Sequence, residues 1–96
     1  MDIKNLFGAM NEVQAKMEGV KKQLDQLTVT KETGAGLVQV TVNGSKKVCA
    51  ISIDEKLLNK TDRQMVQDLI IGAVNLALEE VDHKIQAVIQ EHAAML

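Results

Sequence analysis

One eleven-residue stretch in the middle of the chain limits the possible folds more than any other feature. Residues 34–44 read GAGLVQVTVNG, and the valines at positions 38, 40 and 42 alternate with polar residues. This alternation has the period of a β-strand with one buried face. The Asn43-Gly44 pair tolerates positive φ and predicts a hairpin turn directly after the strand. The middle of the chain must therefore belong to an antiparallel sheet.

Strands are predicted on both sides of this one. Residues 48–53 read as the partner strand after the turn, and the β-branched residues of 28–33 predict a third strand before it. The glycines of residues 34–36 predict the bend between the first two strands. Cys49 alternates with apolar positions and is expected to pack as a small hydrophobic side chain. We expect a three-stranded sheet over about residues 28–54.

The segment before the sheet has the pattern of one long helix, from about residue 3 to residue 27. Its apolar residues are spaced alternately by three and four, as in a heptad repeat, and they are Ile3, Leu6, Met10, Val13, Met17, Val20, Leu24 and Leu27. The rest of the helix surface is mostly polar or charged. This single stripe makes Met10, Val13, Met17 and Val20 candidates for contacts in a dimer or between helical arms.

A second long helix is predicted over about residues 62–94, after a short turn at 55–60. Thr61 followed by Gln64 matches a capping box, and Asp62 places a carboxylate near the helix start. Residues 65–78 are apolar on most sides, which is more than the sheet can cover. This surplus of apolar surface makes Leu69, Ile70 and Val74 further candidates for a dimer contact. Beyond residue 78 the apolar face narrows to one stripe.

Together these elements predict an α+β fold with the order α-β-β-β-α in a single domain over residues 1–96. A domain of this size buries only about 60 to 65% of its unfolded surface, so association between copies is a plausible source of stability. The first helix, at about 36 Å, outreaches a small sheet and should project as an arm. We expect the apolar stripes of the two helices to close on each other as an antiparallel pair, with two such arms in a dimer.

The chain resembles the YbaB/EbfC family of small bacterial nucleoid-associated proteins over nearly its whole length. The matching motifs are Leu27-Thr28-Val29-Thr30, Thr33-Gly34-Ala35-Gly36-Leu37-Val38-x-Val40-x-Val42-Asn43-Gly44, Ile51-x-Ile53-Asp54-x-x-Leu57-Leu58 and Asp68-Leu69. The resemblance implies a cytoplasmic, nucleoid-associated homodimer that binds double-stranded DNA and affects nucleoid organisation and gene expression. It also implies a pincer of two arms with a gap of the order of a DNA duplex.

Charge makes a DNA-binding role less simple, because the net charge is −2 and the second helix is acidic. Residues 61–96 contain Arg63 and Lys84 against six acids, which oppose binding to phosphates. Any single lysine is ordinarily a solvated surface residue. As a set, and with the family resemblance, six lysines are the candidate phosphate contacts: Lys16, Lys21, Lys22, Lys31, Lys46 and Lys47. No recognition helix rich in arginine or amides is evident, so little sequence preference is expected.

Other kinds of chemistry find little support. No nucleophile is visibly paired with a base, so no catalytic residue and no enzyme activity are predicted. Glu80 and His83 share a helical face, but His83 and His92 lack further ligands for a metal site. No cofactor, small-molecule substrate or membrane segment is expected. The alternative function is a prefoldin-like chaperone or protein-protein adaptor clamp, because helix, hairpin and returning helix is also the layout of such subunits.

Overall fold

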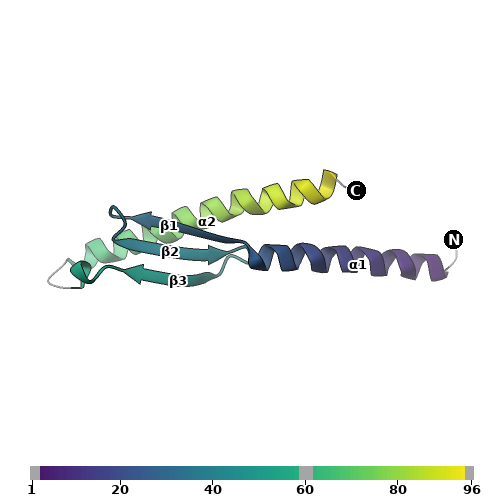
Figure 1. Ribbon diagram of the computed structural model, residues 1–96, viewed down its shortest axis with the longest axis horizontal. Helices are drawn as coiled ribbons and strands as arrows, with labels where there is room; N and C mark the ends of the chain where they lie inside the picture. Colours follow the sequence, from purple (N-terminus) through teal and green to yellow (C-terminus); the bar gives the residue numbers. More distant parts are fainter. Residues whose placement is uncertain (1–2, 59–61, 95–96) are drawn as a thin grey trace.

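The computed structural model describes residues 3–58 and 62–94 (Figure 1). The elements in chain order are α1 (Ile3–Gln26), β1 (Thr28–Thr33), β2 (Val38–Asn43), β3 (Val48–Ile53), a 3-10 turn η1 (Glu55–Leu57) and α2 (Arg63–Ala94). The predicted α-β-β-β-α order is confirmed. The molecule is elongated, with principal extents of 71 × 19 × 17 Å, because α1 continues outward from one end of the sheet (Figure 1).

The sheet has the order β1-β2-β3, and both pairings are antiparallel. The alternation in β2 divides its side chains as predicted: Val38, Val40 and Val42 are fully buried under α2, whereas Gln39 is exposed. The core is completed by small or medium side chains from three elements, namely Val29, Leu57, Ala73, Ala77 and Val81. The alanines let α2 approach the sheet closely, as their full burial indicates.

The prediction for Cys49 is wrong, because this residue is exposed. The pairing of β2 with β3 shifts from Thr41 opposite Ala50 to Val42 opposite Val48, which leaves Cys49 in a β-bulge. The bulge breaks the strict alternation on which the prediction depended. Its thiol lies 3.6 Å from the carbonyl oxygen of Lys47.

The β2-β3 turn also differs from the predicted two-residue Asn-Gly turn. The Asn43 N–H donates to the Lys47 carbonyl oxygen (3.0 Å), which closes a three-residue loop over residues 44–46. The positive φ falls on Lys46, at 61°, as in a type I turn followed by a left-handed residue. The Asn43 side-chain oxygen accepts hydrogen bonds from the backbone N–H groups of Ser45 and Lys47. Asn43 therefore organises the loop through its side chain.

The start of α2 is capped by Asp62. Its carboxylate accepts a hydrogen bond from the Gln64 N–H at 2.9 Å, and its carbonyl oxygen accepts one from the Val66 N–H at 3.2 Å. The Gln64 side chain donates to Asp68 rather than back to the cap. Thr61, the predicted cap, lies outside the described residues. A carboxylate at this position also interacts favourably with the helix dipole.

The expectation that the two apolar stripes close on each other is wrong for the single chain. The two helices project toward the same end of the molecule (Figure 1) and are linked at the arm's base by a 3.0 Å hydrogen bond between His92 and Gln23. Residues 3–17 of α1 nevertheless keep their apolar stripe exposed. Because residues 63–81 of α2 cover the sheet, only residues 82–94 extend along α1, about 20 Å against its 36 Å. Within the described residues, no helix is long and apolar enough to cross a membrane.

Candidate nucleic-acid interface

The loop of residues 44–46 holds the arm to the rest of the molecule. The Gly44 N–H donates to the Leu27 carbonyl oxygen at 3.0 Å, and the Ser45 hydroxyl donates to the Asp25 carboxylate at 2.5 Å. On the other side of the loop, Lys46 Nζ lies 2.7 Å from Asp82 of α2. The loop therefore contacts both long helices at the point where they separate, and it sets the direction of α1.

Gly44 is required in this loop for its lack of a side chain. It is buried, and its φ is not in the positive region. A Cβ built on it would overlap the Leu24 carbonyl oxygen and lie 2.8 Å from the carbonyl carbon. Both atoms belong to the α1 backbone, so no change of rotamer can relieve the overlap. Gly44, which the sequence pattern assigned to a turn, is thus a point where the backbones of the loop and of α1 pack closely.

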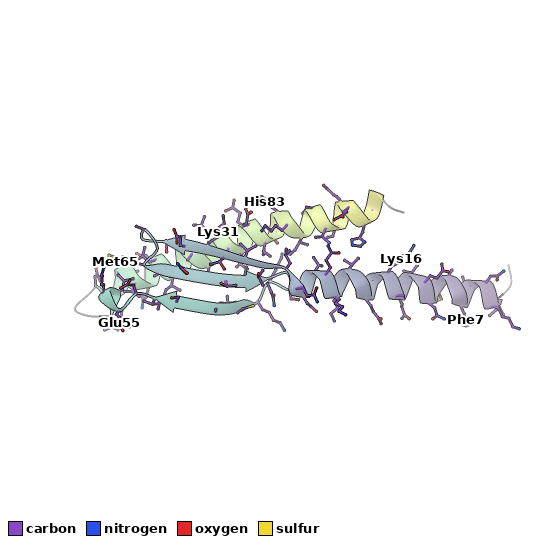
Figure 2. The ribbon with its side chains drawn as sticks, viewed as in Figure 1. Phe7, Lys16, Lys31, Glu55, Met65 and His83 are labelled. Atoms are coloured by element: carbon purple, nitrogen blue, oxygen red, sulfur yellow. The ribbon has the colours of Figure 1, made fainter. Side chains whose placement is uncertain are left out.

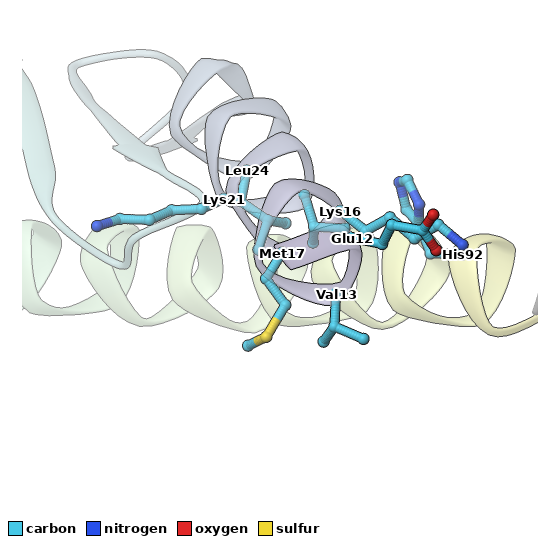
Figure 3. A pocket seen from close by; sticks show the side chains of 8 residues that line it. Glu12, Val13, Lys16, Met17, Lys21, Leu24 and His92 are labelled. Atoms are coloured by element: carbon cyan, nitrogen blue, oxygen red, sulfur yellow. The ribbon is translucent and has the colours of Figure 1, made fainter. Parts of the chain in front are cut away.

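The three candidate lysines of α1, Lys16, Lys21 and Lys22, are all exposed. Lys16 and Lys21 border an open groove of about 560 Å³ at the base of the arm, between α1 and the end of α2. The floor is apolar and consists of α1 side chains with His92 at one side. Figure 3 shows Lys16 and Glu12 extending toward His92, whereas Lys21 extends the other way. These lysines form a basic margin along a helix that stands clear of the core.

The remaining candidate lysines fall in two places. Lys46 lies in the loop at the base of the arm and Lys47 directly follows it, but Lys46 is already paired with Asp82. Lys31 is half-buried and lies opposite Val40, on the face of the sheet that α2 covers. Figure 2 shows Lys31 over the sheet and Lys16 out on the arm. The structure therefore groups five of the six lysines at the arm and its base and places Lys31 apart.

The candidate packing residues also separate into groups. On α1, Met10, Val13 and Met17 are exposed and Val20 is half-buried. On α2, the Leu69 carbonyl oxygen accepts a 2.7 Å hydrogen bond from Thr33, so this side of the helix lies over β1. Ile70 and Val74 are half-buried on another flank of the helix, about 100° and about 140° around its axis from Leu69.

That flank of α2 lies beside β3, which α2 leaves largely uncovered. Val48 and Ile51 of β3 are 46% and 48% exposed although they point to the same side of the sheet as the buried valines. Ile70, Ile71 and Val74 of α2 are further apolar side chains that remain at least partly exposed. We call these five residues together the β3 face.

Two features of the site could not be found from residue spacing along one element. Asp82 neutralises Lys46 across 36 positions, and His92 borders the groove with α1 residues about 70 positions away. His92 continues the spacing of the narrow apolar stripe at Val81, Ile85 and Val88, whereas no pattern along α2 marks Asp82. His83, by contrast, lies 4.0 Å from Glu80 on an exposed part of α2, as its i, i+3 spacing suggests.

Comparison with known proteins places the chain in a family. The whole chain, residues 1–96, matches the YbaB/EbfC DNA-binding family. The chain belongs to this family. It is 42% identical over 83 residues to a nucleoid-associated protein of Chlorobium phaeovibrioides, covering 83% of this chain and 74% of that protein. It is 38% identical over 94 residues to a nucleoid-associated protein of Anaeromyxobacter, covering 98% and 87%.

The YbaB/EbfC fold is also seen in a solved structure. An uncharacterized protein from Helicobacter pylori superimposes with a TM-score of 0.80 at 22% identity, covering 97% of this chain and 98% of that one. At this identity the likeness concerns the fold alone. The YbaB/EbfC family is a family of nucleoid-associated DNA-binding proteins and not of enzymes, and this agrees with the absence of a predicted catalytic group.

Proposed function

We propose that the chain acts in the cytoplasm as a homodimer that binds double-stranded DNA of the nucleoid, mainly through phosphate contacts and with little sequence preference. In this way it influences nucleoid organisation and gene expression. The observation that supports the proposal most directly is the set of exposed lysines on α1, a helix that projects away from the core of a protein in a DNA-binding family. A projecting helix with exposed lysines can approach a duplex without steric interference from the sheet.

The chemistry of this surface favours contacts to the backbone over contacts to base edges. Lysine ammonium groups meet phosphates as point charges and carry no base information. Arginine is the commonest side chain for reading guanine. The sequence contains one arginine, Arg63, which begins α2 at the end of the molecule away from α1 (Figure 1).

The acidic residues of α2 limit where DNA can lie. Asp82 is partly neutralised by Lys46, but Glu79 and Glu80, one turn earlier on α2, add negative charge near the base of the arm. A duplex is therefore expected on the side of α1 that faces away from α2. Lys22 is the most suitable residue there, because it is exposed and does not line the groove between α1 and α2. Lys21 is also exposed but borders that groove, where its side chain extends away from His92 (Figure 3).

The β3 face supports the homodimer. Monomeric proteins rarely leave large apolar side chains together uncovered, and a two-fold axis beside β3 would cover the β3 face with the same residues of a second copy. Such a pairing would also protect the open edge of β3 from unspecific strand addition. The α1 arms lie beyond the end of the sheet and stay outside this interface.

A salt series tests DNA binding. The logarithm of the affinity for a mixed-sequence duplex should fall linearly with the logarithm of salt concentration, with a slope of about −0.9 for each phosphate neutralised. Replacing the duplex with an unrelated sequence should change affinity by less than about threefold, because the contacts carry no base information. Fluorescence anisotropy between about 50 and 300 mM salt measures both. Failure of the dimeric protein to bind at about 50 mM salt would refute the proposal.

A substitution on the β3 face tests the dimer. Ile51→Glu should convert the protein to a monomer at low micromolar concentration, because two-fold pairing would bury the carboxylate against the same residue of the second copy. Ser52→Glu is the matched control, since Ser52 is exposed on the opposite face of the same strand. Sedimentation equilibrium measures the mass. An unchanged dimer mass for Ile51→Glu would place the interface elsewhere.

A further inference from the structure

The most extensive apolar feature without a partner in the described chain is the stripe along α1. We call it the α1 seam, and it comprises Ile3, Leu6, Met10, Val13, Met17, Val20 and Leu24. The first five of these side chains are between 48% and 68% exposed. Two open hollows lie along it, one of about 310 Å³ beside Met10 and the groove of about 560 Å³ beside Met17. An exposed apolar stripe three heptads long indicates a surface for a helix.

The rest of the described chain cannot supply that helix. The far end of α2 reaches the seam at His92, beside the groove, and the helix ends at Ala94. The outer half of the seam, from Ile3 to Val13, extends beyond it. Since no helix among residues 3–58 and 62–94 covers the whole seam, we look for one in a second molecule, and it must carry a matching heptad stripe.

We propose that the α1 seam of one copy packs antiparallel against the α1 seam of a second copy. The spacing of the seam is self-complementary in this direction. With a two-fold axis between residues 11 and 12, Ile3 lies opposite the second copy's Val20, Leu6 opposite its Met17, and Met10 opposite its Val13. Each layer then pairs a heptad position a of one copy with a heptad position d of the other, and all six layers are apolar.

The charges beside the seam select the antiparallel direction. In a parallel pair, Lys16 would lie beside the second copy's Lys21, and symmetry would repeat this repulsion. In the antiparallel pair, Lys16 lies opposite the second copy's Ala9 and one turn from its Glu12. The antiparallel arrangement therefore removes a like-charge contact and brings opposite charges within reach, twice in each pair.

The groove at the base of the arm fits this occupant. In the antiparallel register, the first turns of the second copy's α1 lie against Met17 and Val20, which form the groove's floor. Ile3 and Leu6 of the second copy would place apolar side chains in this groove, with α2 and His92 alongside. The two arms and the two α2 ends would then form a short four-helix arrangement.

This pairing is a different contact from the β3 face. Each α1 carries its sheet at its C-terminal end, so antiparallel arms place the two sheets at opposite ends of the pair. Two copies joined through α1 therefore cannot also meet through β3. A chain with both contacts joins dimers into larger assemblies. If the proposed DNA binding holds, such assemblies can bridge two duplexes, and this consequence rests on the proposed function, whereas the pairing itself does not.

Cysteine cross-linking tests the pairing and its direction. In a Cys49→Ser background, Leu6→Cys mixed with Met17→Cys at tens of micromolar should form a disulfide between copies under mild oxidation, because the two positions share a layer. Either protein alone should remain largely uncross-linked. Cross-linking of Leu6→Cys with itself would indicate a parallel pair, and no cross-link in the mixture would show that the seam is covered otherwise. Either result would overturn the proposal.

Polar substitution on the α1 seam tests whether the pairing joins dimers into larger assemblies. Met10→Gln combined with Met17→Gln keeps helix propensity similar and should remove all species larger than a dimer in sedimentation velocity at tens of micromolar. Asn5→Gln with Ala15→Gln, off the seam, is the control and should leave the larger species in place. With DNA, the seam variant should still bind one duplex but lose capture of a second, labelled duplex. Retention of large species by the seam variant would overturn the pairing, whereas absence of DNA binding in all variants would count against the proposed function alone.

Discussion

Gly44→Ala is expected to destabilise the protein by about 3 kcal/mol, which corresponds to a fall in Tm of about 15 °C for a domain of this size. The added methyl group would overlap the Leu24 carbonyl group. That oxygen also accepts the hydrogen bond from the Leu27 N–H that ends α1. Relief therefore requires that the loop move away from α1 or that the last turn of α1 open. Either movement breaks the hydrogen bond from Gly44 to Leu27.

Thermal unfolding followed by circular dichroism, at one fixed protein concentration, measures this change. Gly19→Ala is the matched control, because a Cβ at Gly19 meets no atom within 4 Å. It should leave Tm unchanged or raise it, since alanine favours an exposed helix by about 1 kcal/mol over glycine. A Gly44→Ala protein as stable as the wild type would show that the loop does not hold the arm through this contact.

The elements of the fold could be predicted from the sequence because their signals are local. Alternating valines specify β2 and its buried face, and heptad spacing specifies α1, whatever the rest of the chain does. The errors concern contacts between elements. Cys49 lies in a bulge of β3, a strand that α2 leaves largely uncovered, and the positive φ falls on Lys46 because the loop closes at Lys47. No local pattern distinguishes these outcomes from the regular ones.

The candidate site was predictable to the extent that helical spacing alone determines it. Lys21 and Lys22 lie on an exposed helix, as the pattern of α1 indicates. The pairing of Lys46 with Asp82 depends on the direction in which α2 leaves the sheet, and this direction follows from packing. Lys31 is a different case, because it alternates with Val29 in β1 and so shares the covered face. That position was readable from the strand period.

Reversing the charge of Lys21 and Lys22 together should produce the largest loss of DNA affinity. In a dimer the double variant Lys21→Glu/Lys22→Glu removes four ammonium groups from the two arms and adds four carboxylates. We expect affinity at low salt to fall at least about 100-fold and the salt slope to become shallower by about 3 to 4. Both residues are exposed on α1, so folding should be unaffected. Anisotropy titrations over the salt series measure both quantities.

The control must change the net charge equally without touching the arm. Lys56→Glu with Arg63→Glu does so at η1 and the start of α2, at the end of the molecule opposite the arm (Figure 1). An equal loss of affinity in the control would mean that DNA responds to the total charge of the protein and not to a surface on α1. Normal affinity of the arm variant, with a loss on Lys46→Glu/Lys47→Glu, would move the contact to the loop. Since Lys46 is already engaged with Asp82, we expect the loop variant to weaken binding less than the arm variant does.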